Sequence, residues 1–528
     1  MATQPIKSED PEQKDSTEEV HFMFDKWIMK TSARDERDYN VPSNVREALQ
    51  DPWAKNWVPS VKNKILNFMN QGSWKFVSKL VPKELGRKVM KTMAVFKVKD
   101  EVDGSIRHKT RICWKGYMQI PGVDYTESFS PVVNDASQRL VFVLYLMKED
   151  KWIIECIDVE AKFLEGSVQR QCFITIPIEV LLLGFVTQKE YDEQCIGLMK
   201  GMYGTGNVDT ALMFFQEYKK YLMNVMEMRQ SRADPCIFYK NNEKGETILI
   251  AMVYVDDTIL VGEKEEVSWF KNTLGERFKY TLQGGIKKHL GINYELKRDK
   301  NGNPMWELTS PMLVKKKFVD AKGHGPKESA LPATPGHTAL KCDGDPEAES
   351  DYRSIVGKIM YLVTKLMPEG SNPARELPRQ FGNPSQEHWK ELEKFVGFLS
   401  REKDKIKLTI RRPKALRMVG MFDANFATDP DDRKSVGGKI VTLGGAIMDW
   451  GSKTMPTVAT STSQAEYQQL LNGCGDLRHE QQLFEELAED KKPGVACDDN
   501  SAAMFLMKNQ AHQCEVPIHQ RTQRARIH

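Results

Sequence analysis

The sequence contains nine cysteines but no two of them in the CxxC spacing of zinc sites and thiol redox centres. An odd number of scattered cysteines also argues against a disulfide framework and favours a reducing compartment. No apolar run approaches the roughly 18–20 residues that a membrane-spanning helix needs. The first 20 residues are acidic and polar, unlike a signal peptide. We therefore expect an intracellular protein with no membrane segment.

An excess of charge of one sign is also lacking. The 76 Lys and Arg residues nearly balance the 73 Asp and Glu residues, which leaves a net charge of +3. Binding to a polyanion must therefore be argued from local clusters of basic residues. A hydrophobic share of 40% and a charged share of 28% are typical of a globular protein. At 528 residues the chain is long enough for three or four compact units.

The spacing of apolar residues predicts a mixed α/β protein. Helical spacing runs from 44 to 67, where Pro52 and Pro59 favour two short helices over one long helix. Two β-hairpins are predicted, at 93–114 with a turn at Asp103-Gly104, and at 236–253. The remaining predicted helices are 136–149, 198–226, 352–366, 388–401 and a segment after Ser463, and the remaining strands are 151–159, 258–261, 419–423, 437–443, 446–450 and 494–497. A stretch rich in glycine, proline and charge at 322–350 is the best candidate for a linker.

Three acidic residues stand where predicted strands end. Asp158 lies near the end of strand 151–159, and Asp256 and Asp257 lie between two apolar strands, where we expect a tight hairpin tip. Converging carboxylates repel one another, and Mg²⁺ prefers such hard oxygen ligands. Two such ions about 3.5–4 Å apart support phosphoryl transfer. A lone Asp at a strand end is more often a turn former or a helix cap, but two adjacent acids in an apolar hairpin cost stability unless something compensates.

The sequence around these acids resembles the reverse transcriptases of Ty1/copia-type retrotransposons. Tyr254-Val255-Asp256-Asp257 is similar to the family's YVDD box, and the segment from Asp158 to Gly166 is similar to D-V-K-T-A-F-L-N-G. The resemblance implies that Asp158, Asp256 and Asp257 are catalytic and bind two Mg²⁺ ions, with Mn²⁺ as an alternative. It also implies that Phe163 lies under the incoming sugar and excludes a 2′-hydroxyl, and that Tyr254 is a substrate-binding residue.

Further motifs follow in the family's order. They include Glu47-Ala48-Leu49, Asp103-Gly104-Ser105, Ser128-Phe129-Ser130-Pro131, Asp234-Pro235-Cys236, His289-Leu290-Gly291-Ile292 and Tyr352-Arg353-Ser354-Ile355. In this family the basic hairpin that contains Lys97, Lys109 and Arg111 is part of the fingers, where such cations are suited to triphosphate or template phosphates. The alternative is that each of the three is an ordinary surface charge. The segment from His289 to Ile292 resembles the one that holds the primer end near the palm.

A second set of acids resembles a ribonuclease H site. Asp423-Ala424 is similar to the start of D-A-D-W, and residues 431–435 match D-D-R-K-S at every position. Cys497-Asp498 and Ser501-Ala502 resemble C-D-N-x-S-A, with Asp499 in place of the Asn. The resemblance implies that Asp423, Glu466 and Asp498 bind two metal ions that hydrolyse the RNA strand of an RNA–DNA hybrid. Glu466 falls on a predicted helix and both aspartates on strand ends, as a converging site requires.

The resemblance predicts the domain order and the partners. We expect a disordered acidic tail at 1–40, then reverse transcriptase fingers, palm and thumb in a right-hand arrangement at 41–310. A linker and connecting region at 311–415 and a C-terminally truncated ribonuclease H-like α/β domain at 416–528 complete the prediction. The implied partners are an RNA template, a DNA primer, RNA–DNA hybrids and deoxynucleoside triphosphates. The implied location is a cytoplasmic particle or the nucleus.

Departures from the family pattern leave three functions open. Where the family reads K-A-L-Y-G-L-K-Q-A-P-R-x-W, Gly206 and Thr210 replace the second Lys and the Arg, and Asp209 replaces the Pro. Losing two cations and gaining an acid weakens binding to a polyanion. Arg526 stands where a fourth ribonuclease H acid is expected. The leading hypothesis is an RNA-directed DNA polymerase with ribonuclease H activity, and the alternatives are a catalytically inactive relic, which binds nucleic acid or nothing, and a protein that keeps hybrid cleavage alone. The sequence has no aspartic-protease or integrase signature, which predicts a processed fragment, a truncated element copy or a derived host gene.

Overall fold

The computed structural model describes residues 41–100, 106–120, 122, 130–159, 171–199, 208–255, 257–310, 327–340, 349–402, 404–488, 492–509 and 518–520. It divides into two compact units. The first comprises Met1–Lys62 with Ala94–Arg111, and the second comprises Asn63–Met93 with Ile112–His528. Each unit is described by itself. The mixed α/β content that the sequence predicts is confirmed.

The first unit packs a helix on a β-hairpin. It contains helix α2 (Val45–Ala48) and the first part of α3 (Ala54–Asn70), which continues into the second unit. Strands β3 (Thr92–Asp100) and β4 (Ile106–Trp114) follow in the chain and pair with each other. The indole of Trp57 meets the rings of Phe96 and His108 edge-on, at 5.1 and 4.8 Å between centroids. The predicted hairpin is therefore confirmed, although its turn at Asp103-Gly104 lies outside the described residues.

Pro59 lies inside α3, so the predicted break at this residue is wrong. A proline removes one helical hydrogen bond, here the one to the carbonyl of Lys55. Lys55 is exposed in the first turn of α3, where water can satisfy its carbonyl. The break near Pro52 is real, because this residue lies between α2 and α3.

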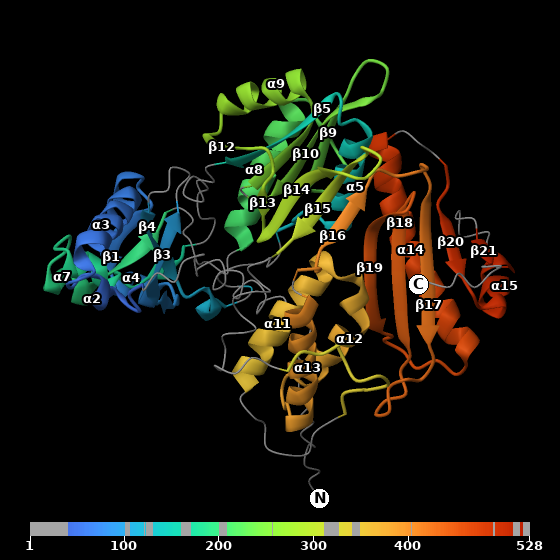
Figure 1. Ribbon diagram of the computed structural model, residues 1–528. Coiled ribbons are helices and arrows are strands. Elements are labelled where there is room, and N and C mark those ends of the chain that lie inside the picture. Colours follow the sequence, from blue (N-terminus) through green and yellow to red (C-terminus); the bar gives the residue numbers. More distant parts are fainter. Residues whose placement is uncertain are drawn as a thin grey trace, which may run out of the picture. The chain divides into compact units, whose positions relative to one another are not determined.

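The second unit contains a six-stranded sheet with the order β12-β5-β11-β10-β9-β8. Its strands are β5 (Trp152–Val159), β8 (Arg229–Gln230), β9 (Ile237–Asn241), β10 (Thr247–Tyr254), β11 (Asp257–Glu263) and β12 (Tyr280–Gly284). Helices α8 (Val208–Asn224) and α9 (Lys264–Gly275) pack on this sheet (Figure 1). Tyr218 of α8, for example, shares a hydrogen bond of 3.1 Å with Thr258 of β11. The predicted hairpin at 236–253 is confirmed.

A small sheet with the order β1-β7-β6-β2 corrects one prediction. It is formed by β1 (Trp74–Ser78), β2 (Val89–Met90), β6 (Phe173–Ile174) and β7 (Gln194–Leu198), and short helices α4 (Leu80–Glu84), α6 (Ile178–Leu182) and α7 (Gln188–Glu193) join these strands. The predicted helix at 198–226 is wrong at its start, because Leu198 pairs with Trp74 in this sheet. Long-range pairing overrides local helix propensity here.

Another sheet and three helices follow. Strands β13 (Lys288–His289), β14 (Ile292–Arg298), β15 (Pro304–Thr309) and β16 (Leu408–Arg411) form a sheet in this order. Helices α11 (Glu349–Leu366), α12 (Ser371–Glu376) and α13 (Gln386–Glu402) lie between β15 and β16 in the chain, with 3₁₀ turns η2 (Pro368–Gly370) and η3 (Leu377–Gln380); a further 3₁₀ turn, η1 (Gly116–Met118), follows β4. The predicted helices at 352–366 and 388–401 are confirmed.

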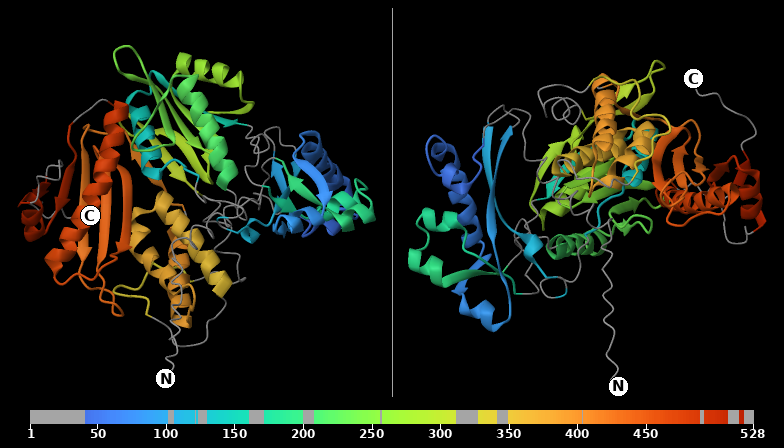
Figure 2. Two further views of the ribbon diagram at one scale, coloured as in Figure 1. Left: turned by 180° about the vertical axis from the view of Figure 1, so that it is seen from behind. Right: turned by 90° about the horizontal axis from the view of Figure 1, so that it is seen from below.

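The C-terminal part is a five-stranded sheet with the order β19-β18-β17-β20-β21. Its strands are β17 (Met418–Asn425), β18 (Val436–Leu443), β19 (Ala446–Thr454), β20 (Val495–Asp498) and β21 (Ile518–Gln520). Strands β17, β18 and β19 are antiparallel to one another, whereas β17, β20 and β21 are parallel. The long helix α14 (Thr462–Ala488) runs along one face of this sheet, and α15 (Ser501–Asn509) follows β20 (Figures 1 and 2).

Helix α5 (Asp135–Met147) joins these layers. All its residues from Ala136 to Leu146 are buried, because α5 contacts β11, β15, β16, β19 and α14. From Leu140 to Leu146 the helix is apolar on every side, which is typical of a helix in such an interior. Asn134 caps its start by accepting a hydrogen bond of 2.9 Å from the amide of Ala136. None of the helices in the described part of the chain combines the length and apolar character that crossing a membrane requires.

Candidate active sites

The first acidic site lies where three strands meet. Asp158, at the end of β5, is directly opposite Asp257, the first residue of β11, and on its other side faces Thr281 of β12. Opposite residues of antiparallel strands project on the same face with Cβ atoms about 4.5–5.5 Å apart. Both carboxylates are half-buried. Like charges placed in this way destabilise a sheet, so the arrangement favours a bound cation.

The hairpin tip next to this site is strained. Tyr254 pairs with Asp257, so Val255 and Asp256 form a two-residue connection between β10 and β11. The φ angle of Val255 is +56°, a left-handed conformation that β-branched residues rarely adopt. The predicted tight tip is therefore confirmed. Asp256 itself lies outside the described residues, as does Phe163.

His289 of β13 flanks the two aspartates. Its Nδ1 lies 3.9 Å from Oδ2 of Asp257, and its ring meets the ring of Tyr254 edge-on at 5.5 Å between centroids. Burial, helped by the nearby Lys365 ammonium and opposed by Asp135, lowers the pKa of His289 to about 4. A histidine that is neutral at pH 7 does not offset the charge of Asp257 through this contact.

Helix α11 supports the loop that carries His289. The Tyr361 hydroxyl donates a hydrogen bond to the carbonyl of Leu290, whose φ angle is +49°. Lys365, one turn further along α11, forms an ion pair with Asp135 at the start of α5. Helix α11 therefore positions a segment that contacts the first acidic site.

The three predicted phosphate-binding cations lie on the hairpin of the first unit. On β3, Phe96 faces Trp57, and on β4, His108 does so. Side chains alternate between the faces of a strand, so Lys97, Lys109 and Arg111 project away from Trp57. All three are half-buried. Their role toward phosphates stays a prediction.

The second acidic site lies at the ends of β17 and β20. Asp423 is on β17, Glu466 is in the first turns of α14, and Asp498 ends β20. A ligand oxygen from each of Asp423, Glu466 and Asp499 lies within 4.8 Å of the other two. Asp498 lies beside this group rather than in it, and is only 1% exposed. Asp499 is absent from the set predicted from the sequence.

The electrostatics of this site are those of crowded carboxylates. Burial and the charges of Asp498 and Asp423 raise the pKa of Glu466 to about 8. Burial, with smaller contributions from Asp499 and Asp423, raises the pKa of Asp498 to about 6. Among the described residues, Oε2 of Glu466 and Oδ2 of Asp498 are buried and lack a hydrogen-bond partner. Buried oxygens of this kind are costly unless a cation or a proton satisfies them.

A cleft of about 1000 Å³ opens onto Asp423. One wall is the exposed face of β17 and β18, including Met421 and Ile440, and the other wall includes residues 331–339 and Arg375 of α12. The cleft therefore joins the second acidic site to the helices that follow β15.

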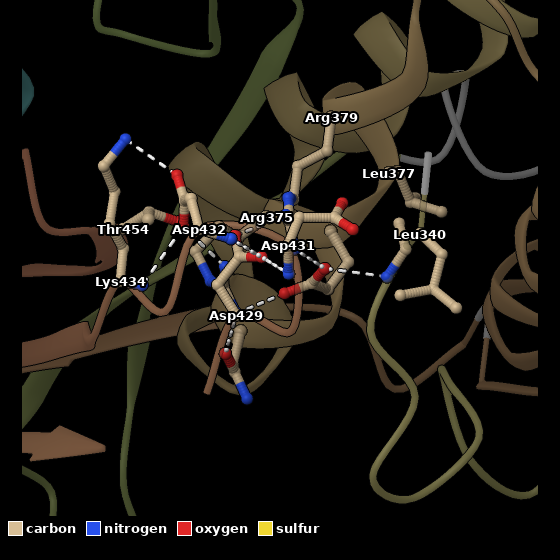
Figure 3. Close-up of polar contacts among 12 residues, drawn as sticks. Leu340, Arg375, Leu377, Arg379, Asp429, Asp431, Asp432, Lys434 and Thr454 are labelled. Carbon is tan, nitrogen blue, oxygen red and sulfur yellow. Dashed lines mark hydrogen bonds and ion pairs between the residues drawn. The ribbon is translucent and has the colours of Figure 1, made fainter. Parts of the chain in front are cut away.

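The D-D-R-K-S motif builds the loop at one end of this cleft (Figure 3). The Asp429 carboxylate accepts a hydrogen bond of 2.9 Å from the amide of Asp431 and forms an ion pair with Arg379. The hydroxyl of Ser435 accepts a hydrogen bond of 3.0 Å from the amide of Ala427. The motif thus shapes the turn after β17, and Asp429, two residues before the motif, ties this turn to Arg379 of η3.

A reverse transcriptase family model matches the part of the chain that contains the first acidic site. Residues 72–317 match the family model described as reverse transcriptase (RNA-dependent DNA polymerase). The chain is 29% identical over 474 residues to the Retrovirus-related Pol polyprotein from transposon RE2 of Arabidopsis thaliana, covering 88% of this chain and 31% of that protein. It is 26% identical over 488 residues to the corresponding polyprotein from transposon TNT 1-94 of Nicotiana tabacum, covering 89% of this chain and 35% of that protein. The polyprotein from transposon RE1 of Arabidopsis thaliana is 27% identical over 472 residues, covering 88% of this chain and 31% of that protein.

Over most of its length the chain is similar to copia-type retrotransposon Pol polyproteins, and residues 72–317 form its reverse transcriptase region. It spans about a third of the length of these relatives. The matched reverse transcriptase region contains Asp158 and Asp257, whereas Asp423, Glu466 and Asp498 lie beyond it.

Only some of the residues that contact the first site could be predicted from the sequence. The His289 segment is visible as a motif, but its contact with Asp257 depends on how β13 packs. Asp499 carries a signal that could have been used, because it is a second acid directly after Asp498. The hydrogen bond of Tyr361 to the Leu290 carbonyl has no signal in the sequence.

Proposed function

We propose that this chain is an RNA-directed DNA polymerase with a second, ribonuclease H-type site. The observation that carries the polymerase proposal is the opposition of Asp158 and Asp257 on neighbouring strands within the reverse transcriptase region. By sequence, Asp256 adds a third carboxylate at the same tip. In this proposal the six-stranded sheet is the palm, the β3–β4 hairpin belongs to the fingers, and α11–α13 form the connecting region.

The donor sets of both sites fit Mg²⁺ or Mn²⁺, because they consist of carboxylate oxygens. Bound as a pair, such ions would activate an attacking oxygen and stabilise a leaving oxygen. At the first site Asp158, Asp256 and Asp257 would hold them, while Tyr254 and Phe163 would contact the nucleotide. Lys97, Lys109 and Arg111 would pair with phosphates of the triphosphate or template.

Two observations support the ribonuclease H part of the proposal. The strand order β19-β18-β17-β20-β21 places β17, which carries Asp423, next to the parallel strand β20, which ends at Asp498. The buried oxygens of Glu466 and Asp498 that lack partners in the described structure are the groups that a metal ion would satisfy. The proposed substrates are an RNA template with a DNA primer, deoxynucleoside triphosphates and RNA–DNA hybrids.

Primer extension on an RNA template tests the polymerase proposal. We expect the full chain to extend a DNA primer in Mg²⁺ or Mn²⁺, and Asp256→Asn or Asp158→Asn to lower the rate by at least about 100-fold. Glu243→Gln, in the exposed turn after β9, is the matched control and should extend normally. No extension by the unsubstituted chain, or equal extension by Asp256→Asn, would favour the alternative of an inactive relic, which the replacements at Gly206, Asp209 and Thr210 motivate.

Cleavage of a labelled RNA–DNA duplex tests the second site separately. Cleavage should survive Asp256→Asn and be lost in Asp498→Asn. Cleavage without any primer extension would favour the third alternative, in which only hybrid hydrolysis remains.

A further inference from the structure

Asp499 occupies an unexpected place at the second acidic site. In the parallel ladder of β17 and β20, Met421 is opposite Cys497. Asp423 lies two residues beyond Met421 on β17, and Asp499 directly follows β20, which ends at Asp498. Oxygens of Asp423 and Asp499 lie within 4.8 Å of each other and of an oxygen of Glu466.

A second observation points to a ligand at the same place. The Glu466 side chain is 8% exposed, and its Oε2 has no hydrogen-bond partner within the described ranges. The neighbouring Asp498 is 1% exposed, and its Oδ2 also has no hydrogen-bond partner within the described ranges. Four carboxylates thus meet where two buried oxygens lack partners. A divalent cation would coordinate these oxygens and would also offset the repulsion among the carboxylates.

Capping of α15 does not account for Asp499. The side chain of Asn500 accepts a hydrogen bond of 2.9 Å from the amide of Ala503, which is the N-cap interaction of α15. Asp498 in turn accepts a hydrogen bond of 2.8 Å from the amide of Asn500. The turn and the helix start are therefore built by the neighbours of Asp499, whose own side chain is exposed.

We propose that Asp499 is a direct ligand of a divalent cation at the second site, a fourth carboxylate beside the predicted set of Asp423, Glu466 and Asp498. The all-oxygen set selects Mg²⁺ or Mn²⁺. The inference deepens the ribonuclease H proposal and rests on the same site, but it concerns metal binding and not cleavage.

Mn²⁺ binding by the full chain tests the inference. The starting protein carries Asp158→Asn and Asp256→Asn, so that the first site does not contribute. Mn²⁺ affinity is measured by titration calorimetry and by the electron paramagnetic resonance signal of free Mn²⁺. Adding Asp499→Asn should weaken binding by about tenfold or more, because it removes one charge in contact with the ion. The control Asp431→Asn removes an exposed carboxylate of the same domain and should leave binding unchanged.

The outcomes separate the two proposals. Weaker Mn²⁺ binding in Asp499→Asn supports the inference even if the unsubstituted chain never cleaves a hybrid, in which case only the ribonuclease H proposal fails. Equal affinity in the Asp499→Asn and Asp431→Asn proteins overturns the inference even if hybrids are cleaved. Absence of any Mn²⁺ binding to the starting protein overturns it as well. Thermal melting without metal should show that neither variant is less stable than the starting protein, so that weaker binding does not reflect unfolding.

Discussion

The guanidinium of Arg139 stacks on the indole of Trp450, with 3.9 Å between the guanidinium carbon and the ring centroid. Arg139 belongs to α5, Trp450 to β19, and the arginine is only 5% exposed. It donates hydrogen bonds to the carbonyls of Met448, at 2.9 Å, and Thr364 of α11, at 2.8 Å. The Trp450 Nε1–H donates to the carbonyl of Val363 at 3.1 Å. One buried cation therefore joins α5 of the reverse transcriptase region, helix α11 and the C-terminal sheet.

Replacing Arg139 should loosen this junction. We expect Arg139→Ala to lower the free energy of unfolding by about 3–5 kcal/mol, because it leaves buried carbonyls unpaired and removes the cation–π contact. Arg139→Lys should recover only part of this loss, since an ammonium lacks the planar fork that serves two carbonyls and a ring together. Urea denaturation measures the effect. Trp450→Phe, which keeps an aromatic ring, should cost less than Arg139→Ala, and wild-type stability in Arg139→Lys would contradict the bidentate role.

A pair of glycines in α14 offers a matched test of helix packing. A Cβ atom at Gly473 would lie 2.1 Å from Cδ1 of Phe422, next to Asp423, whereas a Cβ at Gly475 meets nothing within 4 Å. Gly473→Ala should therefore lower the free energy of unfolding by about 1–3 kcal/mol. Gly475→Ala should raise it by about 0.5–1 kcal/mol, because alanine is the better helix former. Thermal melting compares the two. A gain in both variants would mean that α14 does not pack tightly on β17.

Glu480 should make stability depend on pH. Burial, together with Asp449 and Asp476 and against Lys439 and Arg139, raises the pKa of Glu480 from 4.5 to about 8. Between these values the folded protein holds a proton that the unfolded chain has released, so this group's contribution to stability falls as pH rises from 4.5 to about 8. Glu480→Gln removes this pH-dependent contribution to stability. The difference in unfolding free energy, variant minus wild type, should rise through this window by at most about 1.4 kcal/mol per pH unit. A difference that does not change with pH in denaturant titrations would show that Glu480 is ionised in the fold.

The left-handed backbone at the hairpin tip predicts a stabilising substitution. Val255→Asn should raise the free energy of unfolding by about 1 kcal/mol, because asparagine accepts a positive φ far better than a β-branched residue. Val225→Asn is the control, since Val225 is exposed but has no positive φ. Equal effects of the two substitutions on the melting temperature would rule out strain at Val255.

Much of the fold follows from local patterns. The apolar runs at 247–253 and 258–261 predict a tight hairpin at Tyr254-Val255-Asp256-Asp257, and in the structure each strand extends one residue further into this segment. The end of α11 and the helix carrying Glu466 follow in the same way from helical periodicity. Pro59 shows the limit of this reasoning, because whether a proline ends a helix depends on whether the carbonyl it leaves unpaired can reach water.

The composition of each site depends on contacts that no spacing encodes. Periodicity gives the direction of a side chain along its own strand, but not the strand that lies beside it. The opposition of Asp158 and Asp257 requires β5 to pair with β11, and the place of Asp499 requires the register in which Met421 faces Cys497. Likewise, the sequence of α5 shows that Arg139 interrupts an apolar helix. Only the packing of β19 and α11 around Arg139 provides the ring and the carbonyls that make its burial tolerable. Local sequence patterns identify the acids and the helices, whereas the long-range pairing of strands determines which acids lie close together.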